Sequence, residues 1–235
     1  MNTCKFNALM IVYTSDQNRL DNYYAQKSRL PSSDLQMVEA VNTNDFFDEH
    51  KKTAIDNQLL DEYYITHYLQ NKNKHKQWGC KGKGALGCDM SHIECYKNIL
   101  SSNEFTYCLI LEDDAIITEN FCNNINQILD QATQLQSDYV HLSCNEKFRN
   151  KQYNKSNKLS NLLYKMIPQW HTTAQLVSTR GAEKLLSILP HDAPIDITIS
   201  RHIDMLNATS SIIHVDNGGA ASGGDKNSQF GSLIW

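Results

Sequence analysis

The stretch YCLILEDDAIIT, residues 107–118, places three adjacent acids directly after a run of strand-forming residues. The apolar run before Glu112, Asp113 and Asp114 predicts a buried strand. Adjacent carboxylates at the end of such a strand repel one another and lose solvation, so a positive group usually compensates them. Taken alone, the three acids also fit a plain turn that caps the next helix, and the stretch by itself leaves both interpretations open.

Strands and helices are predicted to alternate on both sides of this stretch. Upstream, the sequence predicts a strand at 8–13, a helix to about 30, a strand at 35–41, a mixed helical region to about 70, a Lys- and Gly-rich loop at 71–87 and a helix at 88–100. Downstream, it predicts a helix through 121–132, a strand at 138–143, a polar loop at 145–161, a strand at 172–178, helices at 181–189 and 195–205, and a strand at 211–215. This alternation predicts one α/β domain with a mainly parallel central sheet over residues 1–216, followed by a flexible Gly-rich tail at 217–235.

Composition favours a soluble globular protein, with 40% hydrophobic and 20% charged residues. A formal net charge of −4 gives no global reason to expect nucleic acid as a partner. We find no run that resembles a signal peptide or a membrane span. The sequence therefore predicts a cytoplasmic protein, with the Lys-rich residues 72–83 as a candidate for peripheral membrane contact.

The seven cysteines are predicted to be reduced and buried, because most of them lie beside apolar residues in predicted helices and strands. The nearest approach to a zinc pattern combines Cys80, Cys88, His92 and Cys95. It lacks the paired short spacings of structural zinc sites, so the sequence favours thiols over a metal centre here.

Other protein classes also carry acids after a hydrophobic strand. A response-regulator receiver has a phosphorylated Asp at the end of a later strand, but the corresponding region here, around residue 159, is a polar loop. A haloacid-dehalogenase phosphatase has an Asp-x-Asp pattern, whereas this chain has Asp113-Asp114-Ala115. A hard divalent cation, held at the carboxyl ends of the strands of an α/β sheet, remains the favoured interpretation.

GALGCDMSH at 84–92 leads into a predicted helix and then ILEDDA. TTAQLVSTRGAEKLL follows at 172–186 and APID at 193–196, and Arg19 comes shortly after the first strand. This order of motifs resembles glycosyltransferase family 25, which includes lipooligosaccharide β-galactosyltransferases and procollagen galactosyltransferases. These blocks extend from about residue 8 to 215. Ala85 and Asn18 depart from the Glu and Asp that the family commonly has there, and both departures concern donor and sugar identity.

The resemblance implies a single-domain A-type glycosyltransferase fold (GT-A, Rossmann-like) and a metal-dependent, inverting hexosyltransferase. Its donor would be a UDP-sugar, in the family most often UDP-galactose, with Mn²⁺ or Mg²⁺ as cofactor. The acceptor would be a hydroxyl of a glycan, a lipooligosaccharide or a collagen-like hydroxylysine, which connects the chain to lipopolysaccharide biosynthesis or collagen glycosylation. A catalytically inactive relative that serves as a binding or adhesion module is the alternative, although such relatives typically lose the acids.

The same resemblance implies roles at the metal. Asp114 is expected to bind the metal directly, and Glu112 to face the ribose or a water molecule or to join the metal. Asp113 is expected near the donor, and spacing alone does not say which of the three carboxylates turns inward. His214 is the expected late-chain metal ligand, with Asp216 as its substitute.

Asp196 after Pro194 is the expected general base, although it could simply cap a helix, and Asp138 is a weaker candidate. Ser91 and His92 are expected in the first turn of a helix, where free N–H groups attract phosphate, unless Ser91 and Asp89 only cap that helix. The remaining donor contacts are expected from Thr14, Ser15 and Arg19, with Lys81, Lys83 and the segment 218–226 as further candidates.

Overall fold

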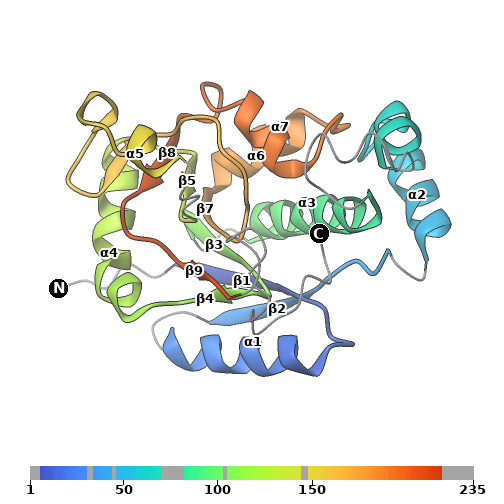
Figure 1. Cartoon of the computed structure of the whole chain (residues 1–235), viewed down its shortest axis with the longest axis horizontal. Coiled ribbons are helices and arrows are strands. Elements are labelled where there is room, and N and C mark those ends of the chain that lie inside the picture. The colour runs from blue at the N-terminus through green and yellow to red at the C-terminus, as the bar shows by residue number, and fades with distance from the viewer. Residues whose placement is uncertain are drawn as a thin grey trace.

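The computed structural model describes residues 6–30, 34–43, 46–69, 82–102, 105–143 and 148–218. Helices cover both faces of a central β-sheet (Figure 1). The helices are α1 Gln17–Arg29, α2 Phe47–Asp56, α3 Gly82–Ser101, α4 Glu119–Gln134, α5 Arg149–Gln152, α6 Thr179–Ser187 and α7 Ile195–Arg201. The described residues also include a π-helical segment, Tyr64–Leu69, and a 3₁₀ turn, Lys155–Asn157.

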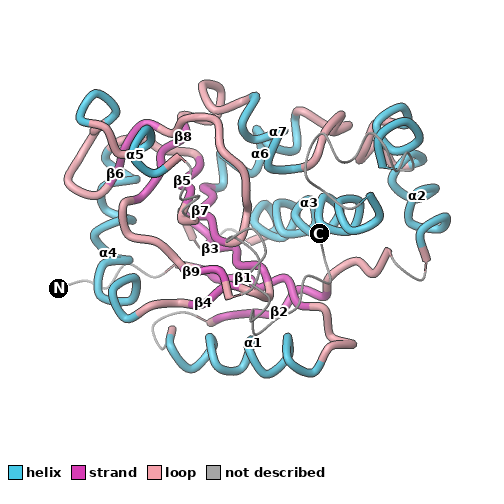
Figure 2. The backbone as a smooth tube through the Cα atoms, viewed as in Figure 1, coloured by secondary structure: helices cyan, strands magenta, loops and turns pink. Residues whose placement is uncertain are grey.

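The central sheet has seven strands in the order β2-β1-β3-β7-β5-β8-β6 (Figure 2). They are β1 Asn7–Val12, β2 Leu35–Glu39, β3 Tyr107–Glu112, β5 Tyr139–His141, β6 Leu163–Lys165, β7 Ala174–Ser178 and β8 Ala208–Ser211. Strands β1, β2, β3, β5 and β8 run in the same direction. β7 is antiparallel to both of its neighbours, β3 and β5, so β3 and β5 run parallel to each other. Only β7 and β6 are reversed, so the predicted α/β fold with a mainly parallel sheet is confirmed.

Side chains of β3 alternate between two hydrophobic cores, as the pleat of a strand requires. Leu109 and Leu111 pack in the core under α1 and α4. Cys108 and Ile110 pack in the core under α3, α6 and α7. Glu112 continues the alternation of Cys108 and Ile110, so it faces α3.

Helix α3 begins at Gly82, earlier than the predicted residue 88. Residues 84–87, predicted as a loop, are helical because Ala85 and Leu86 bury their side chains in a third core. Gly87 lets α3 approach the chain after β2: an added Cβ would lie 2.5 Å from the carbonyl oxygen of Val41. This tertiary packing outweighs the weak helix propensity of glycine.

The late chain also differs from the sequence prediction. Strand β8 ends at Ser211, and the chain then forms β9, Asp216–Asn217, which pairs with β4, Ala115–Ile116. Asn217 therefore lies in a strand, although the predicted tail began there. Residues 219–235 lie outside the described part of the chain, as do Cys80 and the Lys-rich stretch up to Lys81.

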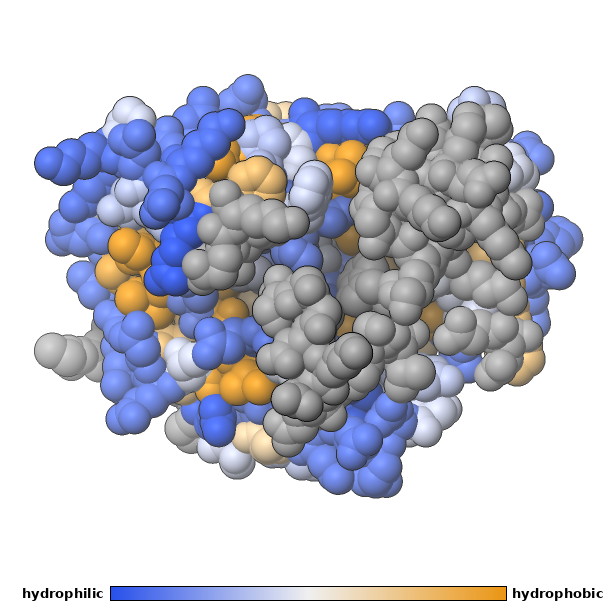
Figure 3. All heavy atoms as spheres, in the orientation of Figure 1, coloured by the Kyte–Doolittle hydropathy of each residue, from blue (hydrophilic) through white to orange (hydrophobic). Residues whose placement is uncertain are grey.

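No helix within the described residues is both long enough and apolar enough to cross a membrane. Figure 3 shows mainly hydrophilic side chains on the coloured part of the visible face, with smaller hydrophobic areas between them.

Candidate active site

The three acids follow one another at the carboxyl end of β3, in the middle of the sheet. Glu112 is the last residue of β3, and Asp113 and Asp114 form the turn that leads into β4. Their side chains are almost completely buried, with residue exposures of 8%, 2% and 4%. Since buried carboxylates need compensation, the partners of each one decide what the cluster can do.

Asp113 is held by the N-terminal part of the chain. Its carboxylate pairs with the Arg19 guanidinium and accepts a hydrogen bond of 3.0 Å from the backbone N–H of Tyr13. The Asn22 side-chain amide donates to the Asp113 carbonyl oxygen at 2.9 Å. Burial raises the pKa of Asp113 to about 6, and the Arg19 charge opposes this rise. Arg19, predicted to contact the donor, thus fixes the acidic turn against α1.

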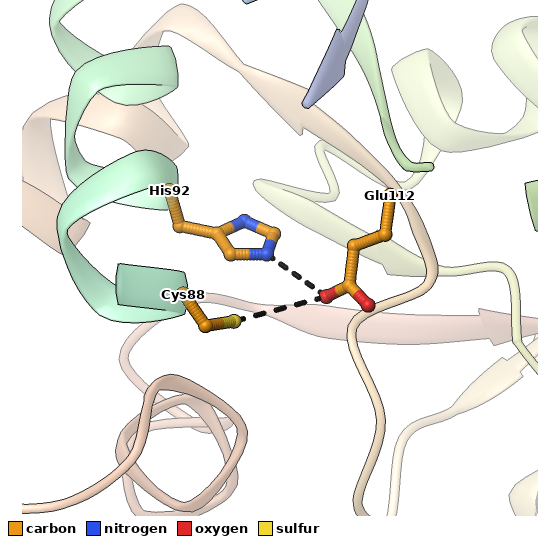
Figure 4. Close-up of side chains that lie close together, drawn as sticks. All are labelled: Cys88, His92 and Glu112. Carbon is orange, nitrogen blue, oxygen red and sulfur yellow. Dashed lines mark hydrogen bonds and ion pairs between the residues drawn. The ribbon is translucent and has the colours of Figure 1, made fainter. Parts of the chain in front are cut away.

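Glu112 is turned toward α3 (Figure 4). Its Oε1 accepts a hydrogen bond of 2.6 Å from the Thr172 hydroxyl and lies 3.1 Å from His92 Nε2. The other ring nitrogen of His92, Nδ1, lies 2.8 Å from Gln175 Nε2. Burial opposes ionisation of Glu112, but its interactions with His92, followed by the hydrogen bond from Thr172, outweigh burial and lower the pKa of Glu112. Glu112 is therefore an ionised carboxylate in a fixed orientation.

Asp114 differs from its neighbours because one carboxylate oxygen is not satisfied. Oδ1 is buried and has no hydrogen-bond partner among the described residues. Burial, followed by the negative charges of Glu112 and Asp113, raises the pKa of Asp114 to about 7. Its backbone carbonyl accepts a hydrogen bond of 2.8 Å from the N–H of Gly218. An orphaned carboxylate oxygen among other acids fits a hard divalent cation, which binds oxygen and neutralises the repulsion.

A pocket of about 160 Å³ lies beside the cluster. Its lining includes Ile11, Tyr13, residues 40–43, Gly84, Gly87, Cys88, Ser91, His92, Glu112 and Asp113. Thr14 and Ser15 are absent from this lining. The Thr14 hydroxyl donates a hydrogen bond of 2.7 Å to the Glu39 carboxylate, and Ser15 is exposed. Tyr13, which the sequence analysis did not select, lines the pocket instead. Its position directly after β1 was the available signal, because ligands of α/β sheets gather at strand ends.

Ser91 and His92 lie in about the third turn of α3, not in its first turn as predicted. Their backbone N–H groups are therefore inside the helix, and the argument for phosphate binding at a helix start does not apply to them. The Ser91 hydroxyl donates a hydrogen bond of 2.7 Å to the Gly87 carbonyl and accepts one of 2.9 Å from the Val41 N–H. It joins α3 to the end of β2, so its contribution to the pocket is positional.

Asp196 lies in the first turn of α7 and is half-buried. Its carboxylate accepts hydrogen bonds from the backbone N–H groups of His171, at 3.4 Å, and Ile197, at 2.7 Å. Pro194 occupies the N-cap position, so Asp196 is not the N-cap residue. Burial raises the pKa of Asp196, and the charge of Glu112 adds to the rise. The two carboxylates thus influence one another across the carboxyl end of the sheet.

Asp138 lies at the opposite end of the sheet, directly before β5, and is fully buried between Arg180 and Lys184. Its ion pairs stabilise the start of α6, and its place excludes it as the general base of a site at the acid cluster.

His214 lies between β8 and β9. Its Nε2 contacts the Tyr153 hydroxyl, and its backbone carbonyl accepts from Thr118 at 3.5 Å. Asp216 is exposed and pairs with Ile116 in the small sheet. The late chain thus runs beside the acidic turn, while the His214 ring contacts the Tyr153 hydroxyl.

A sequence model described as glycosyltransferase family 25 (LPS biosynthesis protein) matches residues 6–199. The solved structures similar to the chain include mouse xyloside xylosyltransferase 1 in its apo form, with a TM-score of 0.40, 10% identity and coverage of 85% of this chain and 82% of that one. They also include galactosyltransferase LgtC in complex with donor and acceptor sugar analogs, with a TM-score of 0.38, 8% identity and coverage of 83% and 70%. None of the curated proteins compared with the chain matches it.

Proposed function

Because the chain belongs to glycosyltransferase family 25, we propose that it transfers galactose from UDP-galactose to a hydroxyl of a lipooligosaccharide-type glycan, with inversion at the anomeric carbon. The observation that supports this most directly is the unsatisfied Oδ1 of Asp114, buried beside two further acids. Most buried carboxylate oxygens have a hydrogen-bond donor, so an unpaired Oδ1 favours a ligand site over a plain turn. A ligand that brings positive charge accounts for it.

Asp114 is the proposed protein ligand of Mn²⁺ or Mg²⁺. When bound, such an ion neutralises the charge that develops on the departing diphosphate. The late chain beside Asp114 is the proposed source of a further ligand, from His214 or Asp216, and Glu112 is close enough to influence the pKa of Asp114. The Asp113–Arg19 pair keeps the turn in place without joining the chemistry.

The pocket beside the cluster is the proposed donor site, with Tyr13 and residues 41–43 against the nucleoside. Asp196 is the proposed general base. It accepts the proton of the acceptor hydroxyl as that oxygen attacks the anomeric carbon from the face opposite the UDP leaving group. Its raised pKa suits this role, because a base with a pKa nearer to neutrality transfers protons more effectively at physiological pH.

UDP release from a panel of UDP-sugars, with and without Mn²⁺, tests the proposal. We expect metal-dependent release that is greatest with UDP-galactose and rises when a lipooligosaccharide acceptor is added. Asp114→Ala should abolish transfer while its circular dichroism spectrum stays that of the folded wild type and its unfolding stays cooperative. Asp130→Ala, which changes an exposed acid on α4, is the matched control.

Two results would contradict the proposal. If no UDP-sugar releases UDP and UDP binding does not depend on metal, the chain is an inactive binding module on this fold. If Asp114→Ala unfolds the chain, the acid has a structural role.

A further inference from the structure

We propose that Cys88, His92 and Glu112 form a binding site for a thiophilic transition-metal ion of the Zn²⁺ class, separate from the hard-cation ligand Asp114. The three ligand atoms, Cys88 Sγ, His92 Nε2 and Glu112 Oε1, lie within 4.8 Å of one another. Figure 4 shows the three side chains converging from α3 and from the end of β3. This site does not depend on the proposed transfer reaction.

The local geometry already resembles a coordination sphere. Glu112 Oε1 lies 3.1 Å from His92 Nε2 and 4.0 Å from Cys88 Sγ. Zinc bonds of about 2.0–2.3 Å in a tetrahedron place neighbouring ligand atoms about 3.2–3.8 Å apart, so only small movements are required. Cys88 and His92 are four residues apart on one helix and therefore project from the same face. The rigid end of β3 supplies the third ligand.

The donor set selects the kind of ion. One thiolate, one imidazole and one carboxylate suit Zn²⁺ or Co²⁺, whereas Mg²⁺ and Mn²⁺ prefer oxygen ligands. Three protein ligands leave a fourth tetrahedral position for water. All three residues line the pocket of about 160 Å³, which provides a path for the ion and space for that water.

The surrounding side chains support the site as an outer shell. The Thr172 hydroxyl donates a hydrogen bond of 2.6 Å to Glu112 Oε1 and orients this carboxylate. Gln175 Nε2 lies 2.8 Å from His92 Nδ1, and Gln175 Oε1 is buried without a partner among the described residues. A half-turn of the Gln175 amide lets Oε1 accept a hydrogen bond from Nδ1–H of His92. His92 then presents the lone pair of Nε2 to the ion, the tautomer that metal-binding histidines adopt.

The number of protons released when the ion binds follows from the protonation states of Cys88, His92 and Glu112. Burial, and then the charge of Glu112, raises the pKa of the Cys88 thiol, so it carries its proton in the metal-free chain. Binding converts the thiol to a thiolate and releases this proton to solvent. The His92 proton moves from Nε2 to Nδ1, and Glu112 is already ionised. One proton is therefore released for each ion bound, and no oxidant or reductant takes part.

Co²⁺ titration of the full chain tests the inference, because thiolate ligation gives a near-ultraviolet sulfur-to-cobalt charge-transfer band. We expect this band to saturate at one ion per chain and to disappear when Zn²⁺ displaces Co²⁺, but to persist with excess Mg²⁺ or Mn²⁺. Cys88→Ser should abolish the band. Cys122→Ser, at a half-buried cysteine on α4 outside the group, should retain it.

His92→Gln provides a second variant that keeps the thiol. We expect it to weaken Co²⁺ binding at least tenfold, with the band shifted in wavelength. No thiolate band in the wild type, or a band that survives Cys88→Ser, would overturn the proposal. Loss of the band in Asp114→Ala as well would show that the two cation sites are one.

Discussion

Glu112, Asp113 and Asp114 are chemically similar neighbours, but each carboxylate meets different partners. The pleat turns Glu112 toward His92 and Thr172, whereas Asp113 meets Arg19 on α1. Asp114 lies in the turn, where neither helix supplies a donor to Oδ1. Orientation at the end of one strand therefore divides three acids into an ionised anchor, a salt-bridge partner and a proposed metal ligand.

The raised pKa of Asp114 makes stability depend on pH. Its folded-state pKa of about 7 lies above that of an exposed Asp, near 4, so the metal-free fold loses stability as pH rises between these values. Asp114→Asn removes this loss. We expect its stability relative to the wild type to increase by about 2 kcal/mol from pH 5 to pH 7, measured by urea unfolding without metal.

Asp130→Asn, at an exposed position, should leave the pH dependence unchanged. If Asp114→Asn follows the wild-type pH profile, then the Asp114 carboxyl is not the buried group that titrates.

The proposed base allows a separate prediction. Asp196→Asn keeps the size of the side chain but cannot accept the acceptor proton. We expect kcat for transfer to fall by about 10²–10⁴-fold, with the KM for the UDP-sugar nearly unchanged. Asp192→Asn, at an exposed acid on the same connection, is the control. A variant at Asp196 with full kcat would place the base elsewhere.

At the scale of elements, α3 connects the acid cluster to the pocket. It brings Cys88 and His92 to Glu112, and it can do so because Gly87 leaves room for the Val41 carbonyl. Gly181 has a parallel role in α6, where an added Cβ would lie 2.1 Å from the Asp138 carbonyl. Two helices thus approach the sheet closely through a glycine, one at each end of the strands.

These two glycines form a matched pair for mutation. We expect Gly87→Ala and Gly181→Ala each to destabilise the fold by about 2 kcal/mol, because the methyl group overpacks against backbone. Only Gly87→Ala should also weaken UDP binding, since Gly87 lines the pocket. Urea unfolding and calorimetric titration with UDP measure the two effects. Equal loss of UDP binding in both variants would contradict the assignment of the pocket.

At the scale of the molecule, the site is assembled from parts of the chain that are distant in sequence. Strand β3 has β1 and β7 on its two sides, and the pairing of β9 with β4 places the late chain beside Asp114. α7 supplies Asp196 at the same end of the sheet, where the charge of Glu112 raises the pKa of Asp196 and the charge of Asp196 raises the pKa of Cys88. The central strands and the C-terminal segment that holds β9 together form the site.

Hydrogen exchange should reflect this arrangement. Amides of β3 and β1, which are paired on both sides, should exchange only through global unfolding. Amides of the edge strands β2 and β6 should exchange faster through local opening. Exchange followed by mass spectrometry at increasing urea concentrations separates these groups. Equal rates in β2 and β3 would contradict the strand order.

The sequence by itself determined the strand with its terminal acids, the alternation of strands and helices, and the motifs of the family. These features are encoded locally: apolar residues with the period of a strand or a helix, and acids next to the run that buries them. Spacing alone did not say which of the three carboxylates turns inward; the structure shows that Glu112 faces α3. Residues 84–87, by contrast, were misjudged as a loop, because glycine propensity carries no information on what the helix packs against.

Only the tertiary structure decided the partners. The reversal of β7, the pairing of β9 with β4, and the meeting of Cys88 and His92 with Glu112 join residues far apart in the chain. Spacing alone gave no zinc pattern, since the third ligand comes from a strand and not from the helix that holds the other two. Which carboxylate remains unsatisfied is likewise a property of the assembled site, because only packing places a donor near Glu112 and Asp113 and none near Asp114 Oδ1 among the described residues.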